Sequence, residues 1–268
     1  MHSKKITRMA ILASGSSGNA ALVQTNKTNI LIDAGISAKR IAVALGAFNL
    51  RTEDLQGIVI THEHSDHIKG LGVLLKKIDV PLYCRMATAK EILRQFPNLH
   101  DNIVEINDFF AIGNVSCEAF DIDHDAVDPV GYSFFHDRVK VGYCTDLGRM
   151  TATVREKLSD CDILTLESNH DPEMLKHGPY PEFLKKRISG VNGHLSNFEA
   201  GLTLAKLRRQ KRCTTFLAHL SRENNLPAIA SETVKKVLKE HDICMINELD
   251  VRLSYPDTIV TCEIIADR

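Results

Sequence analysis

The sequence predicts an α/β fold in which two β-sheets are sandwiched between layers of helices, an αββα arrangement. Strand-like and helix-like segments follow one another in the order strands, helices, strands, helices, which is typical of such layered folds. Hydrophobic residues make up 44% and charged residues 25% of the chain, an ordinary globular composition. No linker rich in Gly, Ser or Pro divides the chain, so we expect one domain over residues 1–268.

The first half of the chain begins with strands. Apolar runs separated by turn residues predict strands at residues 6–13, 20–24, 29–32, 57–61 and 81–84. Apolar residues at helical spacing predict helices at residues 37–45, 68–78 and 88–95. The fourth of these strands leads directly into a cluster of histidines.

The second half contains a longer series of strands, several of which stop at polar or acidic residues. They are predicted at residues 102–106, 115–120, 130–136, 139–145, 163–167, 214–218, 251–253 and 259–264. Helices are predicted at residues 151–158, 173–176, 180–188, 197–210 and 232–241. Ser196 is suited to cap the helix that begins at residue 197.

Charge and cysteine usage restrict the environment of the protein. The formal net charge is −1, so no overall field attracts a polyanion, and any such site must be local. No apolar run approaches the roughly 18 to 20 residues that span a bilayer, which favours no membrane association. The seven cysteines form no C-x-x-C pair, which argues against a disulfide framework and for a reducing compartment. We expect a cytoplasmic protein.

The strongest chemical signal is the segment from His62 to His67, with the sequence His-Glu-His-Ser-Asp-His. It places four ligand-type side chains within six residues, directly after an apolar strand. His62 and His64 can face one ion while Asp66 and His67 turn toward a second. Imidazole and carboxylate together suit Zn²⁺, Mn²⁺ or iron rather than Ca²⁺. The sequence therefore predicts two divalent metal ions, Zn²⁺ or Mn²⁺.

This segment resembles the H-x-H-x-D-H signature of the metallo-β-lactamase superfamily, and the other motifs of that superfamily follow in order. Asp33 ends a predicted strand, as the Asp of the first motif does. His124 stands in Asp-Ile-Asp-His-Asp, Asp146 in Thr-Asp-Leu-Gly and His219 in Ala-His-Leu-Ser. The resemblance covers most of the chain and implies the αββα sandwich of the metallo-β-lactamase fold.

The resemblance also implies a role for each motif residue. It implies two ligand sets that share one carboxylate: His62, His64 and His124 for one ion, Asp66, His67 and His219 for the other, and Asp146 for both. Two ions about 3.5 to 4 Å apart share a water and lower its pKa toward neutrality. Asp66 is placed to orient that water and act as general base. Asp33 is expected to brace the metal loop by hydrogen bonding, without binding metal.

Several further residues are candidates for binding substrate. The turn from Ser14 to Asn19 offers hydroxyl and N–H groups that suit a phosphate oxygen, although such turns also occur in ordinary hairpins. His194 precedes a predicted helix and could protonate a leaving oxygen or grip a phosphate. The expected substrate-binding residues are Ser14, Ser16, Ser17, Asn19, His170, His194 and Asn197. Basic runs at 185–187 and 208–212 could follow a nucleic-acid backbone, or could be solvated helix ends.

Taken together, these motifs closely resemble the YycJ/VicX/WalJ group of the superfamily. That resemblance implies a metal-dependent phosphodiesterase, a DNA exonuclease that degrades from a 5′ end (5′ to 3′). The β-CASP insertion of larger nucleases has no room here, so the sandwich's own loops hold DNA, or a protein partner is needed. Two alternatives stay open: a hydrolase of small cyclic or phosphonate phosphodiesters, and a non-catalytic regulatory partner of a cell-wall signalling system.

Overall fold

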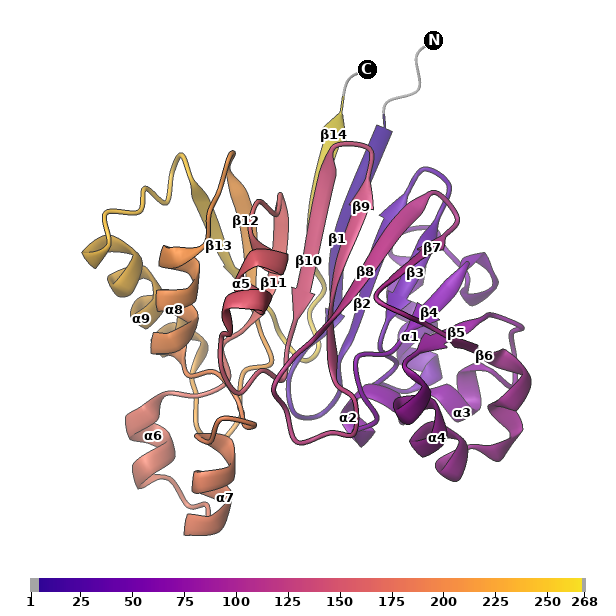
Figure 1. Ribbon diagram of the computed structural model, residues 1–268, viewed down its shortest axis with the longest axis horizontal. Helices are drawn as coiled ribbons and strands as arrows, with labels where there is room; N and C mark the ends of the chain where they lie inside the picture. Colours follow the sequence, from indigo (N-terminus) through magenta and orange to yellow (C-terminus); the bar gives the residue numbers. More distant parts are fainter. Residues whose placement is uncertain (1–4, 267–268) are drawn as a thin grey trace.

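A computed structural model describes residues 5–266 of the chain and contains two sheets packed face to face (Figure 1). In the first sheet the strand order is β14-β1-β2-β3-β4-β5-β6. The bounds of these strands are β1 Lys5–Ala13, β2 Ala20–Thr25, β3 Asn29–Ile32, β4 Gly57–Val59, β5 Leu82–Cys84, β6 Ile103–Glu105 and β14 Val260–Ala266. From β3 to β6 neighbouring strands are parallel.

The second sheet has the order β13-β12-β11-β10-β9-β8-β7. Its strands are β7 Phe109–Ile112, β8 Val115–Asp121, β9 Val130–His136, β10 Val139–Cys144, β11 Ile163–Glu167, β12 Cys213–Ala218 and β13 Leu249–Leu253. From β10 to β13 neighbouring strands are parallel. Each sheet therefore has a parallel region whose strands all end at the same edge.

Helices cover the outer faces of both sheets (Figure 1). On the first sheet lie α1 Ala38–Gly46, α2 Ser65–Ile68, α3 Leu71–Leu74 and α4 Met86–Gln95, with the short 3₁₀ helices η1 Thr52–Asp54 and η2 Pro97–Asn102. On the second lie α5 Ala152–Leu158, α8 Asn197–Lys206 and α9 Pro227–Glu240. Two further helices, α6 Pro172–His177 and α7 Glu182–Ile188, project beyond the end of the second sheet. The αββα sandwich predicted from the sequence is confirmed.

Three apolar layers hold this arrangement together. The layer between the sheets includes Met9, Tyr132, Phe134 and Phe216, each at most 1% exposed. One outer layer joins α1 to α4 to the first sheet, and the other joins α5, α8 and α9 to the second. Burial of this apolar surface is the main stabilising contribution to the fold.

Most predicted elements are confirmed to within a few residues, but three helices differ and one strand was not predicted. In place of the one helix expected at 68–78 there are two short helices, α2, which begins earlier and ends at Ile68, and α3, which ends at Leu74. The helix expected at 197–210 ends at Lys206, because the buried Leu207 turns to extended backbone and packs into the core. Strand β7 was not predicted, and helix α9 begins five residues before the expected residue 232, at a proline. The capping role predicted for Ser196 is confirmed, since its hydroxyl accepts the Glu199 N–H at 3.2 Å.

The break between α2 and α3 has a specific cause at Gly70. In a continuous helix its N–H would bond to the carbonyl of Asp66. Instead it donates to Ala34 O at 2.8 Å, and Asp66 O accepts the Asn19 N–H at 2.8 Å. A Cβ on Gly70 would lie 2.1 Å from Ile36 O, so only glycine permits this approach. The contacts replace helical bonds and fix α2 against the loops that follow β1 and β3.

Within residues 5–266, none of the helices combines the length and apolar character that crossing a membrane requires. The seven cysteines are unpaired, and five of them are buried. The five buried ones, Cys84, Cys117, Cys144, Cys161 and Cys213, are small residues of the protein interior.

Candidate metal centre

The candidate centre lies where the parallel strands of both sheets end. Asp33 follows β3, His62 follows β4 after a short connection, and Asp146, Glu167 and His219 stand at the ends of β10, β11 and β12. Parallel neighbours bring their carboxyl ends to one edge, which explains why residues so distant in sequence meet. Two hydrogen bonds join the sheets at this edge, from Tyr132 Oη to Ile60 O (2.7 Å) and from Val130 N to Thr61 O (3.0 Å).

Three of these strand-end residues have left-handed backbone. The φ angle is 57° at Asp33, 58° at Asp146 and 56° at His219. Asp and His tolerate this conformation better than most residues, yet it costs on the order of 1 kcal/mol each. The turn redirects the chain sharply after the strand while the side chain stays in the centre. The fold thus carries local strain at three positions of one site.

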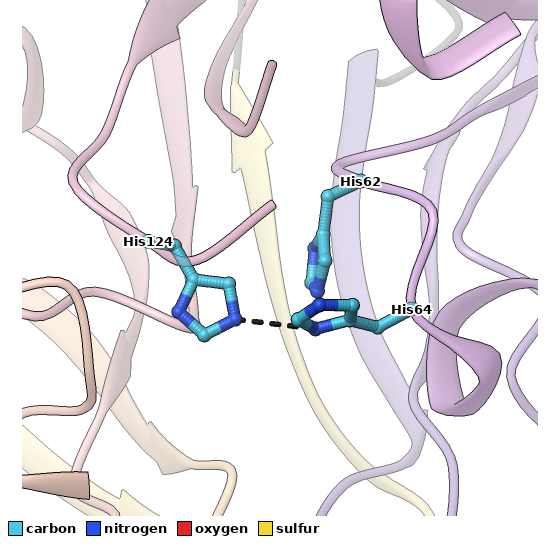
Figure 2. Close-up of side chains that lie close together, drawn as sticks. All are labelled: His62, His64 and His124. Atoms are coloured by element: carbon cyan, nitrogen blue, oxygen red, sulfur yellow. Dashed lines mark hydrogen bonds between the residues drawn. The ribbon is translucent and has the colours of Figure 1, made fainter. Parts of the chain in front are cut away.

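The first candidate ligand set, which could hold one ion, consists of His62, His64 and His124 (Figure 2). His124 Nε2 lies 3.3 Å from His64 Nδ1. Two imidazole nitrogens bound to one tetrahedral zinc, each about 2.0 to 2.1 Å from the ion, would be about 3.3 Å apart. The Nε2 atom of His62 is buried and has no hydrogen-bond partner among the described residues. The set therefore has the spacing of ligands around a single small cation.

The second candidate ligand set, which could hold another ion, consists of Asp66, His67 and His219. Asp66 Oδ2 lies 3.5 Å from the Nε2 atoms of both histidines. Both rings are buried, whereas the Asp66 side chain is 23% exposed, so the carboxylate forms the solvent side of this set. His219 Nε2 is a second buried nitrogen that lacks a hydrogen-bond partner within residues 5–266.

Asp146 lies between the two sets. Its Oδ2 is 3.2 Å from His67 Nε2, and its Oδ1 is 3.9 Å from His124 Nε2. The two oxygens of one carboxylate thus face one histidine from each set, which is the geometry that a shared ligand needs. Oδ2 is buried without a hydrogen bond to any described residue. Buried polar atoms are rarely left unsatisfied, so three of them in one cluster indicate a site built for a cation.

Each buried histidine of the centre is oriented through its other nitrogen. His62 Nδ1 lies 3.0 Å from Thr61 Oγ1, and His67 Nδ1 lies 2.8 Å from Asp33 Oδ2. His124 Nδ1 lies 3.1 Å from Gly193 O. Such contacts fix the tautomer and direct the free nitrogen at the metal. Asp33 also accepts from Thr61 N at 2.9 Å, which ties the metal loop to β3.

Glu167 is a site residue to which no specific role was assigned from the sequence, although the segment 167–171 follows a predicted strand and could line the cleft. It is 0% exposed, and its Oε1 lies 2.9 Å from both His219 Nδ1 and His194 Nδ1. Its Oε2 accepts the N–H groups of Leu147 (2.8 Å) and Leu195 (3.0 Å). The signal for it was present, because β11 lies between the strands that end at Asp146 and His219, and it ends at Glu167 itself.

Carboxylates dominate the electrostatics of the centre. Burial lowers the pKa of His219, but Asp146, Asp66 and Glu167 outweigh it and raise that pKa to about 10. Burial also lowers the pKa of His67, but Asp146 and Asp33 outweigh it and raise that pKa well above its ordinary value. Burial raises the pKa of Glu167, but the adjacent His194 and His219 bring it down to about 2. The carboxylates therefore favour positive charge at the two candidate ligand sets, and a divalent ion can supply it.

His62 behaves differently from these two histidines. Burial, followed by the neighbouring His67, holds the pKa of His62 well below its ordinary value. Its ring is therefore neutral near pH 7, which is the form that binds a metal. The donor set, its spacing and its electrostatics all fit a metal centre.

A cavity of about 220 Å³ opens beside the two ligand sets. Of the residues predicted to bind substrate, Ser16 and His194 line it. Arg187, the last residue of the basic run 185–187, also lines it. The remaining lining residues outside the ligand sets were not among the predicted substrate-binding residues; they are Asn169, Tyr180, Leu184, Ile188 and Ser221.

The other residues predicted to bind substrate do not line this cavity. Ser14 is buried, and its hydroxyl accepts the His219 N–H at 2.8 Å, so it supports the ligand loop. Asn19 is buried against the second ligand set, with Nδ2 3.3 Å from Asp66 Oδ2. Ser17 is half-buried and follows Ser16, which lines the cavity; the Ser17 carbonyl accepts a hydrogen bond from Lys69 Nζ at 2.6 Å.

His170 and Asn197 are both removed from the metal cavity. His170 is 3% exposed and lines a separate cavity between α6 and α7. Asn197 is 0% exposed, because its amide is hydrogen bonded to Ser168 Oγ (2.7 Å) and to Asn225 (2.9 Å) behind the site. Asn197, which was predicted to bind substrate because it begins a helix, is therefore part of a buried hydrogen-bond network.

Comparison with known proteins agrees with this geometry. A family model described as the β-lactamase superfamily domain matches residues 28–219. Exodeoxyribonuclease YycJ of Bacillus anthracis is 37% identical over 234 residues, which cover 86% of this chain and 89% of the relative. Exodeoxyribonuclease WalJ of Streptococcus pneumoniae is 36% identical over 256 residues, which cover 94% of this chain and 95% of the relative.

A solved structure agrees at the level of the fold. The metallo-β-lactamase fold protein YhfI from Bacillus subtilis is 15% identical and superposes with a TM-score of 0.71, over 96% of this chain and 100% of that chain. Family model, relatives and fold point the same way as the motifs. The chain belongs to the β-lactamase superfamily and, within it, to the family of the YycJ and WalJ proteins.

Proposed function

We propose that this protein is an exodeoxyribonuclease that hydrolyses DNA phosphodiester bonds at a centre of two divalent ions, Zn²⁺ or Mn²⁺, proceeding from the 5′ end. The observation that carries the proposal is the pair of ligand sets on either side of Asp146, whose oxygens face His67 on one side and His124 on the other. The names of the two relatives support DNA as the substrate. The cytoplasmic location expected from the sequence stays a prediction.

The metal ligands and the attacking water define the first step. When bound, the two ions supply a hydroxide at neutral pH and stabilise charge on the phosphate oxygens. Burial raises the pKa of Asp66, but the neighbouring His219 and His67 outweigh it and hold that pKa well below its usual range. Asp66 therefore stays ionised. Its side chain is partly exposed to the cavity, so it can accept a hydrogen bond from the attacking water and orient it.

His194 is suited to the departure of the leaving oxygen. Its Nδ1 lies 2.9 Å from Glu167 Oε1, while the ring lines the metal cavity and is 16% exposed. Burial lowers the pKa of His194, but the Glu167 carboxylate outweighs it, so the pKa is raised. A protonated imidazole beside the cavity can donate its Nε2 proton to the oxygen that leaves the phosphorus.

A panel of substrates tests the proposal. Single-stranded DNA, double-stranded DNA and bis-p-nitrophenyl phosphate are each incubated with the protein and added Mn²⁺ or Zn²⁺. Each DNA is tested with its 5′ end blocked and with its 3′ end blocked. We expect mononucleotide release from DNA that stops when the 5′ end is blocked. His64→Ala should abolish it, whereas His100→Ala, at a histidine whose side chain is 81% exposed, should not.

A small-diester hydrolase is the second candidate, favoured by the limited volume of the cavity, about 220 Å³. Turnover of bis-p-nitrophenyl phosphate without cleavage of any DNA would support it and refute the nuclease. No turnover of any substrate by the metal-loaded protein would instead favour the regulatory role.

A further inference from the structure

The metal cavity has one permanently charged cationic side chain among the described residues that line it, Arg187. Arg187 belongs to α7, and Tyr180, Leu184 and Ile188, from the same segment, line the cavity with it. The neighbouring Lys185 and Lys186 face a different cavity, on the other side of α7. The basic run of the sequence is therefore divided, and only its last residue reaches the metal centre.

Arg187 is held next to the first ligand set by an ion pair. Its Nε donates to Asp125 Oδ2, and Asp125 Oδ1 lies 3.4 Å from His124 Nε2. The side chain of Arg187 is 52% exposed. Within residues 5–266 its two terminal NH₂ groups make no hydrogen bond, so they are available to a ligand. Ion pairs between partners this exposed are weak, and an incoming anion can displace or share the guanidinium.

A guanidinium has the geometry to hold a phosphate through two parallel N–H groups. We propose that Arg187 binds a phosphate of the DNA strand that lies in the metal cavity, and that Asp125 keeps the guanidinium at the cavity until DNA arrives. This inference rests on the nuclease function proposed above. It makes α7, rather than an inserted domain, the element that grips the strand beside the reacting bond.

The second basic run of the chain offers a natural contrast. Arg208 donates to Asp160 Oδ2 at 2.8 Å, and Asp160 precedes β11, whereas the metal centre lies where β11 ends. Arg208 is thus at the opposite edge of the sheet. Its side chain is 59% exposed and ion-paired, much as that of Arg187 is. It provides a matched control for loss of one surface arginine.

The test compares Arg187→Ala, Arg187→Lys and Arg208→Ala with the wild type, in kinetics on single-stranded DNA over a range of salt concentrations. We expect Arg187→Ala to raise KM for DNA roughly tenfold, as loss of a charged hydrogen bond implies. The slope of log(1/KM) against log[salt] should become shallower by about 0.7, the contribution of one phosphate contact on a single strand. Arg187→Lys should retain the slope, and Arg208→Ala should match the wild type.

Bound metal per chain is measured in parallel and should be equal in all four proteins, because Arg187 is not a ligand. If the wild type cleaves DNA and Arg187→Ala has an unchanged KM and an unchanged salt slope, the proposal for Arg187 is wrong while the nuclease function stands. If the wild type fails to cleave any DNA, the nuclease function itself is refuted. An equal change in Arg208→Ala would also overturn the assignment, because the effect would then be one of overall charge.

Discussion

Glu167→Gln is the substitution that tests the organisation of the centre most directly. It keeps the shape of a side chain that is 0% exposed, but it removes the charge and replaces one oxygen by an NH₂ group. If the remaining oxygen keeps the Leu147 and Leu195 N–H groups, the NH₂ group must face the Nδ1 atoms of His194 and His219. A proton can then no longer be held on those nitrogens.

The size of the effect follows from these contacts. His219 loses the partner that keeps its Nδ1 protonated and its Nε2 free for metal. Each hydrogen bond to a charged group is worth about 1.5 to 3 kcal/mol, part of which is recovered by relaxation. Substitutions of such supporting residues lower metal affinity about 10- to 100-fold, which corresponds to roughly 1.4 to 2.8 kcal/mol. We expect the affinity of one ion to fall by this factor while the fold persists.

Metal affinity is measured by competition with a coloured chelator, and folding by circular dichroism and urea denaturation. Glu118→Gln is the matched control, because Glu118 is also a buried strand carboxylate, 7% exposed, but it pairs with Lys157 instead of a metal-centre histidine. It should leave metal affinity unchanged. Equal affinities for Glu167→Gln and the wild type would refute the reasoning that Glu167 controls the tautomer of His219.

Three further predictions concern Asp33, which supports the metal loop, His194, the proposed general acid, and Phe216 in the core. Asp33→Asn removes the carboxylate 2.8 Å from His67 Nδ1 and should lower metal affinity about 10- to 100-fold by calorimetry; an unchanged affinity would show that the brace is dispensable. His194→Gln should lower kcat about 100-fold and remove the alkaline decline of the pH–rate profile. That decline should begin above the ordinary histidine pKa, because Glu167 outweighs burial and raises the pKa of His194; persistence of the same decline in the variant would assign it to another group. Phe216→Ala, in the 0%-exposed core between the sheets, should lower the free energy of unfolding in urea by about 3 to 5 kcal/mol, and a loss below about 1 kcal/mol would contradict the packing described.

The layered fold and the position of the site were predictable because both depend on local patterns. Each of Asp33, His62, Asp146 and His219 follows an apolar run, and strand ends in parallel sheets share an edge. Glu167 obeys the same rule. It was given no specific role because a strand-end glutamate outside a recognised motif is as common in surface loops as in a site.

What the sequence did not predict depends on contacts between distant segments. The break at Gly70 requires the carbonyls of Ala34 and Asp66 to find partners from other loops. Asn197 was expected to face substrate, but its partner Asn225 comes from a loop 28 residues later, and together they form a buried network. The role of Arg187 likewise depends on α7 folding over the cavity, which no local periodicity indicates.

The left-handed backbone at Asp33, Asp146 and His219 has a consequence for the lifetime of the protein in the cell. The left-handed turns at Asp146 and His219 position ligand side chains before any ion arrives, at a cost in backbone strain that metal binding can offset. At a metal concentration 100 times the dissociation constant, binding stabilises the native state by about 2.7 kcal/mol. For a chain of this size that corresponds to a melting temperature higher by roughly 5 to 10 °C. Metal starvation would therefore expose the chain to proteolysis as well as stop its chemistry, linking the abundance of the protein to the supply of its cofactor.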